Sequence, residues 1–114
     1  MHIHYISEQN SILNHFLAQI RDVNIQKDSM RFRKNIERIG EIMAYELSKT
    51  LDYKEIDVQT PLGIKHTTTI AEPVVLCSIL RAGLALHQGF MSFFDNAENG
   101  FVSAYRHHYD NDDK

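Results

Sequence analysis

One turn in the middle of the chain combines residue types that bind phosphate. Arg81 follows a nearly continuous apolar run and precedes Ala82 and Gly83. Arginine presents a fork of N–H donors that matches phosphate oxygens, and glycine lets the backbone approach an anion closely. A helix that begins after such a turn adds free N–H groups and a positive dipole end. The turn therefore predicts a phosphate or diphosphate site, and a strand-to-helix loop with a solvent-facing arginine is an equal alternative.

A second arginine has a similar position further along the chain. Arg106 follows a short run from Phe101 to Tyr105 that is typical of a strand. In open α/β sheets, ligands bind at the carboxyl ends of parallel strands. If the two strands are parallel, Arg106 emerges at the same edge as Arg81, and the pair could clamp a polyphosphate. The alternative is a charge that only marks the boundary of a strand.

The seven histidines do not form a recognisable metal pattern. His2 and His4 lie near a terminus, where order is often low, and the adjacent His107 and His108 tend to point in different directions. No cysteine or carboxylate set completes a site. We therefore expect no metal held by protein ligands alone, and the spacing gives no Ser-His-Asp grouping and no Walker-type loop.

The second half of the chain predicts a β-α-β unit that positions the arginines. Residues 73–80 form an apolar run that suits a central parallel strand covered on both faces, in which Cys77 is expected to be a small buried hydrophobe. A helix is predicted over residues 84–94, a turn at Asn99 and Gly100, and a strand over residues 101–105. The core candidates of this helix are Leu86, Phe90, Phe93 and Phe94.

Two helices are predicted before this unit. The first covers residues 11–21, and the second begins after a cap at Asp28 or Ser29 and runs to about Lys49. The apolar stripe of the second helix comprises Phe32, Ile36, Ile39, Met43 and Leu47. The charged residues Arg33, Lys34, Glu37, Arg38 and Glu41 lie mostly away from it and are interpreted as a solvated face. Gly40, within the stripe region, would allow a close helix contact.

Alternating residues 55–60 predict a half-buried strand that ends at Pro61, with a turn at Gly63 and a weaker strand over residues 65–70. A parallel sheet normally needs helices on both faces, and the chain offers one crossover helix. We therefore expect that the natural protein continues beyond Lys114, or that a partner chain covers the sheet.

Length and composition indicate one modest globular domain. The chain has 114 residues, 43% of them hydrophobic, a net charge of -3 and one cysteine. This charge favours neither nucleic acid nor an anionic membrane as a partner. A single cysteine cannot form an internal disulfide, which fits a reducing cytoplasm. The polar start is unlike a signal peptide, and no apolar run approaches the roughly 20 residues that span a bilayer.

In its motifs, the chain resembles the uracil phosphoribosyltransferases. The similarity begins in the first two helices with HFLAQIRDVNIQKDSMRFRKNIERIGEIMAYELSKTL, continues with VQTPLG at residues 58–63, and includes ILRAGL at residues 79–84 and AYR at residues 104–106. The order of these motifs is far more specific than any one of them. The resemblance covers about residues 10–106 and implies an α/β fold: two amino-terminal helices plus a partial parallel sheet of the type I phosphoribosyltransferase fold.

The resemblance also implies an activity. The family transfers the phosphoribosyl group of 5-phosphoribosyl diphosphate to uracil, which gives UMP and diphosphate in cytoplasmic pyrimidine salvage. Arg81 and Arg106 would contact the donor, with Ala82 and Gly83 completing the candidate site, and no catalytic residue is assigned. Mg²⁺ would accompany the diphosphate, GTP is a possible effector, and a homodimer or higher homo-oligomer is expected, with no nucleic acid or membrane partner.

Two motifs of the family are absent from the sequence. These are the acidic and Thr/Gly-rich loop that cradles the 5-phosphate, and the carboxyl-terminal uracil pocket with its Gly-Asp-Ala segment. Residues 1–114 are therefore expected to be the amino-terminal part of one phosphoribosyltransferase domain that is inactive alone. After Arg106, His107-His108-Tyr109 replaces residues that are acidic in many relatives. Two alternatives are a nucleotide-binding regulatory protein of this fold and a fragment that only dimerises.

Overall fold

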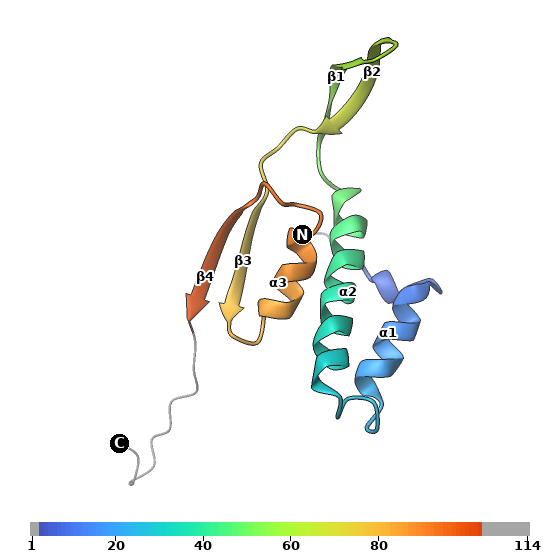
Figure 1. The fold of residues 1–114 in the computed structure, drawn as a ribbon, viewed down its shortest axis with the longest axis vertical. Coiled ribbons are helices and arrows are strands. Elements are labelled where there is room, and N and C mark those ends of the chain that lie inside the picture. The colour runs from blue at the N-terminus through green and yellow to red at the C-terminus, as the bar shows by residue number, and fades with distance from the viewer. Residues whose placement is uncertain (1–2, 104–114) are drawn as a thin grey trace.

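The computed structural model describes residues 3–103, and Arg106 lies outside them. The elements are a short 3-10 helix (Ile6–Glu8), α1 (Ile12–Arg21), α2 (Ser29–Ser48), β1 (Tyr53–Thr60), β2 (Gly63–Ile70), β3 (Val75–Leu80), α3 (Leu84–Met91) and β4 (Glu98–Ser103). In Figure 1, α3 lies between the β3–β4 sheet and α2, and α1 packs on the far side of α2. This arrangement confirms the predicted α/β class. None of the described helices is long and apolar enough to cross a membrane.

Both amino-terminal helices begin at a side-chain cap, and both predictions are confirmed. The hydroxyl of Ser11 accepts a hydrogen bond from the Leu13 N–H at 3.1 Å. For α2 the cap is Asp28 rather than Ser29, because the Asp28 carboxylate accepts from the Arg31 N–H at 3.1 Å. Each cap satisfies one of the N–H groups that a helix start leaves without a partner.

Two glycines allow α2 and α3 to pack at very short distance. A Cβ atom placed on Gly40 would lie 2.6 Å from the Leu86 carbonyl oxygen, and one placed on Gly89 would lie 2.1 Å from the Glu37 carbonyl oxygen. Both distances are far below van der Waals contact, so the two backbones meet where neither has a side chain. The close helix contact predicted at Gly40 is therefore confirmed, and Gly89 is its counterpart in α3.

The two strands of the predicted β-α-β unit are parallel, as expected. In their register, Leu76 lies opposite Asn99 and Ser78 opposite Phe101. Because β4 starts at Glu98, the turn predicted at Asn99 and Gly100 is wrong. Turn-forming residues are accommodated in the strand because pairing with β3 outweighs their local preference. The crossover helix also ends earlier than predicted, at Met91.

Only one face of the β3–β4 sheet is covered within the described residues. Leu76, Ser78 and Leu80 point toward α3 and are half-buried, whereas Val75 and Ile79 on the other face are 63% and 60% exposed. Cys77 is also on this exposed face. The prediction of a strand covered on both faces, with a buried Cys77, is therefore wrong for residues 3–103. Apolar composition indicated that the strand is central, but burial depends on what packs against it.

The strands β1 and β2 form an antiparallel hairpin that projects beyond the helices (Figure 1). Thr60 pairs with Gly63 across the two-residue loop, and Gly63 has a φ of 137°, which favours glycine. Leu62 at the tip is fully exposed. The prediction of a half-buried first strand is wrong, because most side chains of the hairpin are exposed. An isolated two-stranded hairpin is at best marginally stable in water.

Candidate anion-binding site

A groove separates the first turns of α2 from the turn that joins β3 to α3. Its volume is about 760 Å³. The residues that line it are Gln26, Ser29, Phe32, Arg33, Ile36, Arg81, Ala82, Leu84 and Ala85. The structure therefore places Arg81 and Ala82, two of the predicted site residues, in the wall of one groove.

Four elements are oriented with their anion-favouring ends at the end of the molecule where this groove lies. Strands β3 and β4 end at this edge of the molecule, and α2 and α3 begin there (Figure 1). The carboxyl ends of parallel strands and the amino-terminal ends of helices both favour anionic ligands, the latter through their N–H groups and their dipoles. The topology thus brings an electrostatically favourable edge to the position of the turn.

Two arginines give the groove its positive charge, one from each wall. Arg81 comes from the β3–α3 turn and Arg33 from the second turn of α2. None of the described residues that line the groove is a carboxylate. Among residues 3–103, neither guanidinium lies within 4.0 Å of a carboxylate oxygen. Arg33 is exposed, as its interpretation as part of a solvated helix face predicted. Its place in the groove wall was not predicted, because only the packing of α2 beside α3 reveals it.

The turn itself is compact. The Gly83 N–H donates to the Ile79 carbonyl oxygen at 3.0 Å, and the Leu84 N–H donates to the Arg81 carbonyl oxygen at 3.2 Å. A Cβ atom on Gly83 would lie 3.0 Å from the same Ile79 oxygen. The Leu80–Arg81 peptide bond is cis. Gly83 therefore shapes the turn by its close approach to β3, and its own N–H is engaged there.

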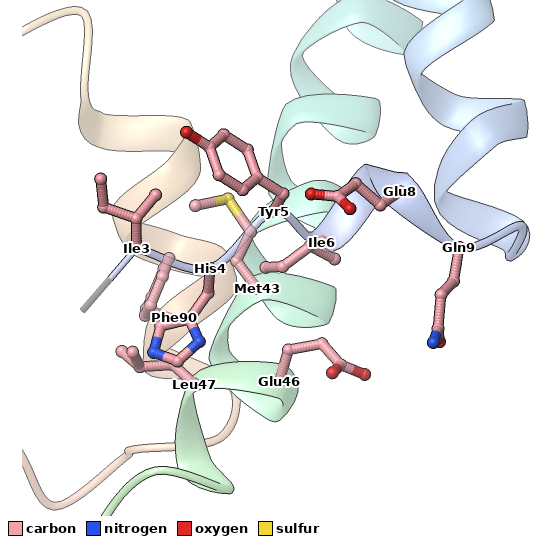
Figure 2. Close-up of a pocket in the computed structure, with 10 residues that line it drawn as sticks. All are labelled: Ile3, His4, Tyr5, Ile6, Glu8, Gln9, Met43, Glu46, Leu47 and Phe90. Atoms are coloured by element: carbon pink, nitrogen blue, oxygen red, sulfur yellow. The ribbon is translucent and has the colours of Figure 1, made fainter.

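A second cavity, of about 610 Å³, lies under the amino-terminal segment and has a different character. Figure 2 shows that Met43 and Leu47 of α2 and Phe90 of α3 form its apolar wall. The carboxylates Glu8 and Glu46 line it, and its described lining residues include neither lysine nor arginine. Carboxylates repel phosphate, so the groove beside Arg81 is the better candidate for an anion.

Comparisons with known proteins assign the chain to a family. The family profile described as uracil phosphoribosyltransferase matches residues 6–114. The uracil phosphoribosyltransferase of Porphyromonas gingivalis is 49% identical over 110 residues, which cover 96% of this chain and 51% of that protein. The protein of the same name from Sulfolobus acidocaldarius is 42% identical over 98 residues, covering 83% of this chain and 44% of that protein.

A solved structure, that of the AQ2163 protein from Aquifex aeolicus, superposes with a TM-score of 0.71 at 27% identity. The match covers 84% of this chain and 46% of the other. The chain thus spans about half the length of the relatives that it matches. Both the ordered motifs and these matches extend along nearly the whole chain, which belongs to the uracil phosphoribosyltransferase family.

Proposed function

We propose that residues 1–114 are the amino-terminal part of one phosphoribosyltransferase domain and supply its diphosphate-binding turn. The whole protein would transfer the phosphoribosyl group of 5-phosphoribosyl diphosphate to uracil, giving UMP and diphosphate in cytoplasmic pyrimidine salvage. Family membership supports this reaction. The observation that carries the assignment to this half of the protein is the groove that has Arg81 and Arg33 in opposite walls and no carboxylate among its described lining residues.

The chemistry of the transfer fits such a groove. As the bond from the ribosyl carbon to the diphosphate oxygen breaks, negative charge accumulates on the leaving diphosphate. Fixed guanidinium donors aimed at that charge lower the barrier. Mg²⁺, when bound, would act as a Lewis acid on the diphosphate. Among residues 3–103 no carboxylate lines the groove, so this described wall fits an ion that enters with the diphosphate.

Other elements of the function rest on the family resemblance. Arg106, which follows β4 in the sequence, would contact the donor. The 5-phosphate loop and the uracil pocket would belong to the remaining part of the domain. GTP as an effector is a proposal of the same kind. On this basis the chain alone binds the donor without forming UMP.

Isothermal titration tests the proposal directly. We expect the chain to bind 5-phosphoribosyl diphosphate with Mg²⁺ at one saturable site, because Arg81 and Arg33 both line the groove within it. A parallel assay with uracil should yield no UMP. Absence of binding by a chain that circular dichroism shows to be folded would contradict an autonomous diphosphate site in this half.

We also propose that the chain self-associates through its uncovered apolar surfaces. The exposed sheet face carries Val75, Ile79 and Val102, which are 63%, 60% and 51% exposed, and the hairpin adds Ile64 at 64%. Large contiguous apolar surface is unusual on a monomer and marks an interface. Sedimentation velocity should therefore show a dimer or larger species whose fraction rises with concentration. A single monomeric species across a hundredfold concentration range would refute this.

A further inference from the structure

Three polar side chains form a hydrogen-bonded network between α3 and the β3–β4 sheet. The imidazole of His87 in α3 is buried, with a relative exposure of 6%. Its Nδ1 lies 2.5 Å from the hydroxyl oxygen of Ser78 in β3. Its Nε2 lies 2.7 Å from the amide oxygen of Asn99 in β4. One side chain therefore connects a helix to both strands of the sheet that it covers.

The hydrogen-bond partners orient the side chains of this network. The Asn99 side-chain N–H donates to the Ala97 carbonyl at 3.3 Å, so the amide oxygen of Asn99 faces His87. Nε2 of His87 is then the donor to Asn99, and Nδ1 shares a hydrogen bond with the Ser78 hydroxyl. The ring also packs on Phe101, with centroids 4.9 Å apart. Both ring nitrogens of His87 therefore have a hydrogen-bond partner, one in each strand of the sheet.

His87 connects this hydrogen-bonded network to both ends of the turn that carries Arg81. Ser78 precedes Arg81 by three residues, and its hydroxyl contacts the His87 ring. The backbone N–H of His87 donates to the carbonyl of Gly83 at 2.9 Å. The His87 side chain thus holds Ser78, before the turn, and the His87 backbone N–H holds Gly83, at the end of the turn. A leucine in its place would fill the space without fixing this orientation.

We propose that His87 is a positioning residue for the anion site, and that its hydrogen bond to Ser78 sets where the Arg81 turn lies relative to the start of α3. This rests on the proposed function, in which Arg81 binds diphosphate. His87 touches no ligand. It acts through the turn, because a displacement of about 1 Å at a binding group is enough to weaken a charge-assisted contact substantially.

The test compares three variants of the full chain by titration with inorganic diphosphate and Mg²⁺. His87→Leu fills the same space with an apolar side chain and removes both side-chain hydrogen bonds, so binding should weaken by about tenfold or more. His87→Asn keeps an acceptor near the Nδ1 position, and most of the affinity should return. Leu13→Ala is the control, because Leu13 is buried in α1, away from the turn. It lowers stability and should leave the dissociation constant unchanged.

Ser78→Ala serves where His87→Leu does not fold, since it removes the same hydrogen bond with little change in volume. Wild-type affinity in folded His87→Leu, or in Ser78→Ala, would overturn the proposal. So would equal weakening in His87→Asn and His87→Leu, because the Ser78 bond would then not be the cause.

A second readout separates this proposal from the proposed function. If the wild-type chain binds no diphosphate, the proposed function fails, and the backbone amide resonances of Arg81, Ala82 and Gly83 still report on the turn. They should shift or broaden in His87→Leu and return toward wild type in His87→Asn. Unchanged amide resonances in His87→Leu would overturn the positioning role whatever the wild-type chain binds.

Discussion

Replacing Gly89 with alanine should destabilise the protein by about 3 kcal/mol or more, near or above the upper end of the usual cost of overpacking. The new methyl group would lie 2.1 Å from the Glu37 carbonyl oxygen, 2.9 Å from the Glu41 nitrogen and 2.9 Å from the Gly40 Cα. All three are backbone atoms of α2, so no side chain can rotate away. The two helices must separate, and the packing of α3 against α2 is lost.

The sign of this effect is opposite to that expected from helix propensity. In an exposed helix, the change from glycine to alanine stabilises by up to about 1 kcal/mol. Gly100→Ala is the matched control, because its Cβ would meet the Cys77 sulfur at 3.7 Å, an ordinary contact. Urea denaturation should show a much lower midpoint for Gly89→Ala and a small change for Gly100→Ala. Equal midpoints for Gly89→Ala and the wild type would mean that the helices are not in contact at this point.

Local patterns in the sequence were sufficient for the elements whose stability is local. Both amino-terminal helices could be predicted because their apolar spacing and capping residues act within a few positions of one another. The strand before Arg81 and the helix after it followed from an apolar run that Arg81, Ala82 and Gly83 interrupt. That interruption also identified the wall of the groove to which Arg81 contributes.

The features that sequence analysis missed depend on partners distant in the chain. Asn99 and Gly100 have turn-forming preferences, yet pairing with β3 places them in a strand. Arg33 became a candidate site residue only because α2 packs beside α3. His87 carried no signal of its own, since its two hydrogen-bond partners lie 9 and 12 residues away in different strands. In each case the deciding interaction is tertiary, and no local spacing encodes it.

The substitution with the largest expected effect on ligand binding is Arg81→Ala. A hydrogen bond to a charged group contributes about 1.5–3 kcal/mol, which corresponds to a loss of affinity of roughly 10- to 100-fold for 5-phosphoribosyl diphosphate with Mg²⁺. Arg81→Lys should fall between alanine and the wild type, because it retains the charge and loses the fork of donors that matches two oxygens at once. Isothermal titration of the three proteins in one buffer measures these differences.

The control for Arg81 must remove a charge of the same sign without touching the groove. Arg31 meets this requirement, because it is exposed in the first turn of α2, lies 4.0 Å from the Asp28 carboxylate and does not line the groove. General loss of positive charge would weaken binding to a similar extent in Arg31→Ala and Arg81→Ala, and added salt would screen both losses. A specific contact requires that Arg31→Ala binds nearly as the wild type does while Arg81→Ala does not. If the two variants bind alike, the groove attracts diphosphate only through its net charge, and the turn is not the site.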